Sequence, residues 1–163
     1  MTVSDGKTLP AGAHDFDFFF GSWKVRHRRL RERLVGSREW DEFGGAVRVR
    51  PILAGLGNFD ENVIGLPQGP YEACTLRIYH AVSQDWSIHW IDGRNPKFDT
   101  PMVGRFRDGV GTFLAEDVLQ GRPIRVRFLW THEGTQSARW EQAFSPDRGL
   151  TWETNWVMDF ARV

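Results

Sequence analysis

The sequence predicts an all-β fold: an antiparallel up-and-down barrel of about ten strands with a short N-terminal helix. Three observations support this prediction. Apolar and polar residues alternate in most segments after residue 21, glycine and proline recur at short intervals, and no segment carries a long helical period. Because ten consecutive antiparallel strands without covering helices would leave two exposed edges, we expect the sheet to close on itself.

The first element is a short helix within residues 14–21. Asp15 can cap its start and Gly21 can end it. Phe16, Phe19 and Phe20 would then share one face, at helical spacings of three and four. Residues 1–13 mix Thr, Ser, Gly and Pro without periodicity, so we expect a flexible lead-in there and a single barrel domain over residues 14–163.

Ten strands follow, separated by segments rich in turn-forming residues. Asp108-Gly109 and Glu133-Gly134 are typical tight-turn pairs. The predicted strands cover residues 22–34, 38–49, 58–66, 71–80, 85–91, 101–107, 111–118, 122–131, 137–144 and 150–161. A barrel of this strand number is wide enough to enclose a cavity.

Composition limits the class of protein. Lysine plus arginine equals aspartate plus glutamate at 21 each, which argues against a dedicated nucleic-acid binder. The one cysteine, Cys74, cannot form an intramolecular disulfide. No run of about 18 apolar residues predicts a membrane span, and the first ten residues do not resemble a signal peptide. We therefore expect a cytoplasmic protein without a membrane partner.

Strand alternation divides each segment into two faces, and the apolar face should point inward. This places many of the 8 tryptophans on one inner wall, where a flat or greasy molecule could bind. A packed aromatic core is the alternative for any single tryptophan. The predicted ligand-binding residues are Trp40, Glu61, Arg77, Tyr79, Trp90, Trp130, Trp140, Gln142 and Trp156.

Three of these residues are polar groups that could orient a ligand. Glu61 lies between Phe59 and Val63 on an apolar face, where a carboxylate would have a raised pKa and could act as a general acid or base. A rim position or an arginine partner is the simpler interpretation of Glu61. Gln142 lies between two aromatic residues and could equally form a core hydrogen bond, and Arg77 shares a strand face with Tyr79.

Two local motifs are more specific than composition. Gly21-Ser22-Trp23 opens the first strand directly after the helix, and Arg162 ends the last strand. This arrangement resembles the calycin superfamily of lipocalins, fatty-acid-binding proteins and nitrobindin-like barrels. The resemblance implies that Arg162 packs over the indole of Trp23 at the closed end of the barrel. Residues 145–152, SPDRGLTW, match the S-x-D-x-G-x-T-W pattern of an Asp box, which predicts a structural hairpin turn.

A narrower resemblance covers residues 15–163. It rests on the ordered segments TLRIY (75–79), WSIHWID (86–92), VGRF (103–106), RFLW (127–130), RWEQAFS (139–145) and WETNW (152–156). These look like a family of small bacterial calycin-like proteins without an established activity. The resemblance implies the fold and no particular reaction.

The function that we predict is binding of a small apolar or aromatic molecule in a tryptophan-lined cavity. A cofactor-free cyclase, isomerase or hydrolase in the same cavity is the alternative. No catalytic residue is assigned, because no Ser-His-Asp set or nucleophile elbow is present. A nitrobindin-like haem protein is less well supported, because the last histidine is His132 and none follows in the final strand. We expect no cofactor and no metal.

Basic residues crowd the first predicted strand. They are Lys24, Arg26, Arg28, Arg29, Arg31 and Arg33. Lys24, Arg26 and Arg28 share a face opposite Trp23, so we expect them outside, paired with acidic residues of the next strand. Contact with an acidic partner or with nucleic acid is the less favoured alternative, and a homodimer through the outer faces stays open.

Overall fold

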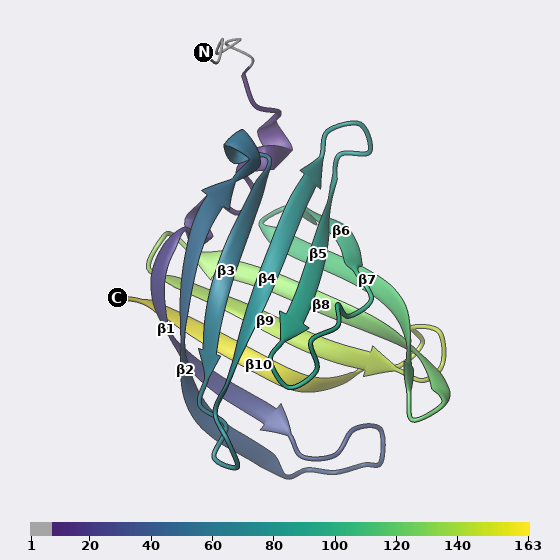
Figure 1. Cartoon of the computed structure of the whole chain (residues 1–163). Helices are drawn as coiled ribbons and strands as arrows, with labels where there is room; N and C mark the ends of the chain where they lie inside the picture. The colour runs from purple at the N-terminus through teal and green to yellow at the C-terminus, as the bar shows by residue number, and fades with distance from the viewer. Residues whose placement is uncertain (1–7) are drawn as a thin grey trace.

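The computed structural model describes residues 8–163 as a closed antiparallel barrel (Figure 1). The predicted fold class is therefore confirmed. The strands are β1 (Gly21–Leu30), β2 (Trp40–Ile52), β3 (Gly57–Ile64), β4 (Tyr71–His80), β5 (Asp85–Asp92), β6 (Met102–Arg107), β7 (Val110–Leu119), β8 (Arg122–Glu133), β9 (Ser137–Ser145) and β10 (Glu153–Arg162). Three short 3₁₀ turns accompany them: η1 (Ala11–His14), η2 (Asp17–Phe19) and η3 (Leu53–Gly55).

Each strand pairs with its neighbours in the chain, and β1 pairs with β10 to close the ring. Trp23 lies opposite Arg162 in this last pairing. Because every strand has a hydrogen-bonded neighbour on each side, the sheet formed by residues 8–163 has no free edge strand. The circular order also places β1 and β6 on opposite sides of the barrel.

The N-terminal helical segment differs from the predicted single turn. It consists of η1 and η2, and Asp15 lies between them without capping either through its side chain. Phe16 and Phe19 are buried as expected, but the third buried ring is Phe18 rather than Phe20. Residues 1–7 of the predicted lead-in lie outside the described residues.

The three buried phenylalanines close one end of the barrel. Phe16 packs edge-on against Trp86, Phe106 and Trp130, with ring centroids 5.0, 4.9 and 5.6 Å apart. Such edge-to-face contacts between aromatic rings are favourable in addition to the area they bury.

The Arg162–Trp23 contact expected from the calycin resemblance is present at this end. The Arg162 guanidinium carbon lies 4.1 Å from the centroid of the Trp23 ring. Its nitrogens also donate to the carbonyl oxygens of Phe18 and Phe20, at 2.7 and 2.6 Å. Arg162 therefore joins the last strand to the N-terminal segment that closes the barrel.

Most strand boundaries differ from the predicted ones by one to four residues, and two of these differences shorten the first and the last strand. β1 ends at Leu30, and residues 31–39 form a loop. β10 begins only at Glu153, because the Asp box occupies the preceding residues: Asp147 accepts from the Thr151 amide at 2.8 Å, and Gly149 has a φ of +92°. A β-bulge between Thr154 and Trp156 then changes the alternation.

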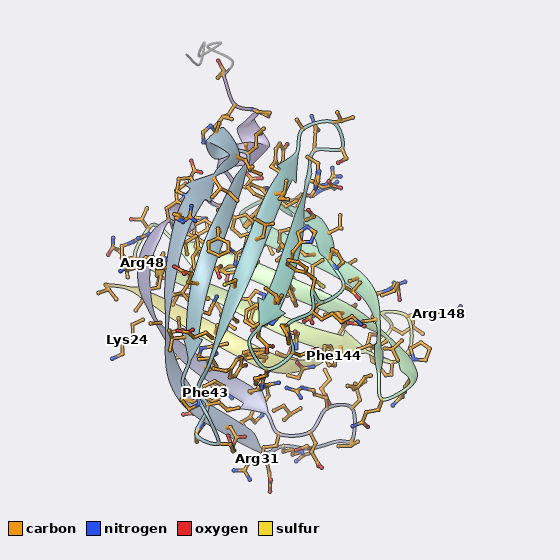
Figure 2. The ribbon with its side chains drawn as sticks, viewed as in Figure 1. Lys24, Arg31, Phe43, Arg48, Phe144 and Arg148 are labelled. Atoms are coloured by element: carbon orange, nitrogen blue, oxygen red, sulfur yellow. The ribbon has the colours of Figure 1, made fainter. Side chains whose placement is uncertain are left out.

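Two of the three basic residues on the outer face of β1 pair with β2 as predicted. Arg26 and Arg28 contact Glu42 at 3.1 and 3.6 Å, whereas Lys24 forms no salt bridge within residues 8–163. In the loop after β1, Arg31 contacts Glu39 and Asp41 at 3.2 and 2.9 Å. Figure 2 shows Lys24 projecting away from the barrel. Among residues 8–163, no helix is long and apolar enough to cross a membrane.

Candidate functional site

The barrel encloses a cavity of about 260 Å³ next to the phenylalanines of the closed end. Its lining includes residues from Phe19 at the closed end to Arg94 and Asp117 near the loops of the other end. The loops that follow β1, β3, β5, β7 and β9 lie at this second end (Figure 1). Because lining residues come from these loops, we call this end the mouth of the barrel. The volume lies near the lower limit for small-molecule sites.

Aromatic side chains of β8, β9 and β10 line the cavity together with Trp90, which reaches them from β5 on the opposite side of the barrel, and we call this set the aromatic wall. The rings of Trp90 and Trp140 both pack edge-on against Trp156, with centroids 6.1 and 5.5 Å away. Phe128 packs against Trp140 at 4.9 Å, and Phe144 completes the wall. These residues occupy alternate inward positions of their strands, as the sequence predicted. The wall offers flat apolar surface to a planar molecule.

A buried histidine fixes the orientation of Trp156. The indole N–H of Trp156 donates to Nδ1 of His27 at 3.1 Å, and the His27 ring stacks on Phe43 at 4.8 Å. His27 is buried, and this desolvation together with the charge of Arg29 lowers its pKa to about 4. Neutral His27 can therefore accept the indole hydrogen bond near pH 7.

The inner part of the cavity carries a buried polar network that joins β3 to β4. Arg77 forms an ion pair with Asp60 at 2.6 Å and donates to Oδ1 of Asn58 at 2.9 Å. The amide of Asn62 donates to Asp60 as well. Since both charges are almost fully buried, with side-chain exposures of 4% for Arg77 and 1% for Asp60, each depends on the other for compensation.

Several hydrogen-bond donors in and beside this network have no acceptor. Within residues 8–163, Nε of Arg77, Nδ2 of Asn58 and Nε1 of Trp130 are buried without a hydrogen-bond partner. Arg77 and Trp130 both line the cavity. A carbonyl or hydroxyl oxygen of a bound molecule could accept from such donors, because buried donors are normally satisfied.

The mouth carries charges of both signs on different sides. Arg29 and Arg33 line it from β1 and the following loop, and Asp99 and Asp117 line it from the loop before β6 and from β7. Burial raises the pKa of Asp99, and the nearby carboxylates of Asp117 and Asp92 raise it further. The two sides of the mouth therefore favour ligand groups of opposite charge.

Six of the nine predicted ligand-binding residues line the cavity. They are Arg77, Trp90, Trp130, Trp140, Gln142 and Trp156. Gln142 additionally donates from its amide to Oδ1 of Asn155 at 2.9 Å, which combines cavity lining with the core hydrogen bond considered for it. Whether any of the six binds a ligand stays a prediction.

The other three predicted residues do not line the cavity. Trp40 lies at the start of β2, where the Arg28 guanidinium carbon is 5.0 Å from its ring. Tyr79 is buried at the closed end against Gly12 and Trp86. Glu61 is exposed on the outside of β3.

Glu61 lies outside because the inward and outward faces of β3 are the reverse of those predicted. Phe59 and Val63 were expected inside, yet Val63 is 49% exposed and Phe59 lies beneath the Arg50 guanidinium, 5.2 Å from it. Asp60 and Asn62 point inward instead, because buried Arg77 on the adjacent strand requires a counter-charge and acceptors.

Sequence reasoning missed the polar members of the site. Asp60, Asn62 and Thr75 were assigned no role, although Arg77 was assigned one. The available signal was the neighbouring strand: an inward arginine on β4 predicts an acidic residue at an inward position of β3. Arg29 and Arg33 were recognised only as part of the basic run of the first strand.

Within the described part of the chain, no group of three or more His, Cys, Asp or Glu residues could hold a metal ion, and no histidine of that part lines the cavity.

The comparisons with known proteins bear on the fold. No family model and no curated protein matches the chain. Among solved structures, the chain is similar to the S-type phycobiliprotein lyase CPES from Guillardia theta, with a TM-score of 0.58 and 8% sequence identity, over 91% of this chain and 90% of that chain. At this identity the similarity shows a shared β-barrel fold and nothing more.

Proposed function

We propose that this protein binds a small, planar, largely apolar molecule in the barrel cavity. The observation that carries the proposal is the wall formed by Trp90, Trp140 and Trp156 beside an internal cavity of about 260 Å³. The indoles of Trp90 and Trp140 both stand at steep angles to that of Trp156, so a planar ligand has both faces and edges to pack against.

The buried network at the inner part of the cavity gives the bound molecule a direction. Arg77 and Trp130 line the cavity there with donors that have no partner among the described residues, so a ligand with an oxygen acceptor at its inner end is favoured over a pure hydrocarbon. The Asp60 carboxylate already accepts from Arg77 and Asn62 and is not free to act as a base, so a binding function is favoured over the alternative of cofactor-free catalysis.

The structural neighbour suggests a ligand class to try. That protein is a phycobiliprotein lyase, and a bilin-like chromophore reaching out through the mouth is one candidate for this chain. The narrower resemblance to bacterial calycin-like proteins stays part of this proposal and is consistent with the barrel.

Native mass spectrometry of the freshly purified protein tests the proposal directly. A non-covalent adduct of defined mass supports a binding barrel and gives the ligand class. If the protein carries no adduct, titration with planar aromatic compounds and a bilin, followed by quenching of tryptophan fluorescence, is the second test.

Substitution of one wall residue supplies the specificity control. Trp140→Leu should weaken binding of a planar ligand about tenfold, because one of the packed indole surfaces is lost. Trp40→Leu removes a tryptophan outside the cavity and should leave the affinity unchanged. Equal effects of the two substitutions, or none from either, would contradict binding at this wall.

A further inference from the structure

The mouth of the cavity carries two half-buried arginines whose charges are only partly compensated, because Asp92 acts on Arg29 and Glu153 on Arg33 from beyond salt-bridge distance. Arg29 and Arg33 both line the cavity, and neither forms a salt bridge with any residue in the range 8–163. The other basic residues of this segment behave differently: Arg26, Arg28 and Arg31 all contact carboxylates of β2 or of the loop before it. The difference follows the strand alternation, since Arg29 is on the inner face of β1.

The surroundings of the two arginines make their positive charge costly. Burial together with the nearby charge of Arg29 lowers the pKa of Arg33 to about 10, and Nε of Arg33 is buried without a partner among the described residues. Burial also lowers the pKa of Arg29. Partly desolvated guanidinium groups that repel each other are stabilised by an anion placed between them.

The third arginine of the mouth is already compensated. Arg94 contacts Asp92 at 3.4 Å, and its guanidinium carbon lies 3.6 Å from the centroid of the Tyr71 ring. Arg94 adds to the positive potential but has its own partner. Arg29 and Arg33 remain the groups available to a ligand.

The position of Arg29 connects this charge to the aromatic wall. Its guanidinium carbon lies 4.7 Å from the centroid of Trp156, the indole at the centre of the wall. A planar molecule packed on the wall would therefore place a substituent on its outer end beside Arg29. Asp99 and Asp117 on the other side of the mouth would direct a negative substituent toward β1.

We infer that the ligand of this barrel is an aromatic carboxylate, held by its ring on the tryptophan wall and by its carboxylate on Arg29 and Arg33. A guanidinium group matches a carboxylate in shape and can donate two parallel hydrogen bonds to it. The inference rests on the proposed function, because it assigns the outer end of the same ligand.

A matched pair of compounds tests the inference. 2-Naphthoate and 2-naphthamide share ring and shape but differ in charge, and isothermal titration calorimetry of the full chain measures the affinity of each. The wild-type protein should bind the carboxylate at least about tenfold more tightly than the amide, the range of a charge-assisted hydrogen bond.

The variants locate the effect. Arg29→Met/Arg33→Met should remove that preference, because the affinity for the carboxylate should fall at least about tenfold more than the affinity for the amide. Arg33→Met alone should remove part of the preference, and it spares the contact of Arg29 with Trp156. Arg26→Met/Arg28→Met makes the same charge change on the outer face of β1 and should preserve the preference.

The outcomes separate the two proposals. Equal affinities for the carboxylate and the amide in the wild type, both reduced by Trp140→Leu, overturn the inference and leave the cavity as a binding site. A preference that survives Arg29→Met/Arg33→Met also overturns it. Binding of neither compound contradicts both proposals for ligands of this class.

Discussion

The buried ion pair between Arg77 and Asp60 gives the strongest prediction about stability. Arg77→Met removes the cation and leaves the Asp60 carboxylate uncompensated in the interior. The two groups are 2.6 Å apart and almost fully buried, so solvent screens them little. Removal of one partner from such a pair typically costs about 3–5 kcal/mol.

The expected effect is large compared with the stability of a domain of this size, which is roughly 5–15 kcal/mol. With a urea dependence of about 2 kcal/mol per molar, a loss of about 4 kcal/mol lowers the midpoint of unfolding by about 2 M. Asp60→Asn combined with Arg77→Met removes both charges, and about 1–3 kcal/mol should be recovered relative to the sum of the single substitutions.

Urea unfolding followed by tryptophan fluorescence measures all four members of this double-mutant cycle. An exposed pair provides the control: Arg139 contacts Asp159 at 3.3 Å with 45% and 42% of the side chains exposed, and Arg139→Met should shift the midpoint by less than about 0.5 M. Additive effects of the Asp60 and Arg77 substitutions would refute the reasoning that each charge is stable only with its partner.

Two further predictions concern His27 and the packing of β6. Because the pKa of His27 is about 4 in the folded state and 6.5 for a histidine in an unfolded chain, the unfolded chain binds the proton more readily between these values. The free energy of unfolding should therefore be fully retained above about pH 6.5 and should fall by about 3 kcal/mol as the pH drops to 4. His27→Gln should reduce this loss, and urea titrations at several pH values measure it. Gly104→Ala would place a methyl carbon far inside van der Waals contact with the backbone oxygen of Thr112, so it should destabilise the barrel by about 1–3 kcal/mol or more. Gly69→Ala is the control: no atom lies within 4 Å of the new carbon, so the melting temperature should change little. An unchanged melting temperature for Gly104→Ala would contradict the tight β6–β7 contact.

Most of the barrel could be predicted because its strands obey one simple rule. On β8 and β9 most of the large apolar residues recur at every second position, and Trp130 and Trp140 lie inside as expected. Turn pairs such as Asp108-Gly109 mark the strand ends well, since both residues take a positive φ in the structure.

The prediction failed where the inside of the barrel is polar. Alternation assigns apolar residues to the interior, so it placed Phe59 and Glu61 inside and Asp60 outside. The interior of β3 is instead set by the need to neutralise Arg77 on the adjacent strand, which is a contact between residues 17 positions apart and leaves no periodic signal. The mouth was missed for a related reason: Arg29 and Arg33 look like their neighbours in the basic run until the strand alternation and the loop after Leu30 separate them.

The pairing of β1 with β10 has a consequence for how the protein folds. Trp23 and Arg162 are about 140 residues apart in the chain, so the contact that closes the ring is the least local of all and carries a high loop-closure entropy. On a ribosome, β1 and β9 remain unpaired along one side until β10 has been synthesised. The cavity is complete only after this step. A ligand can therefore bind the finished barrel, but it has no complete site to bind on the growing chain.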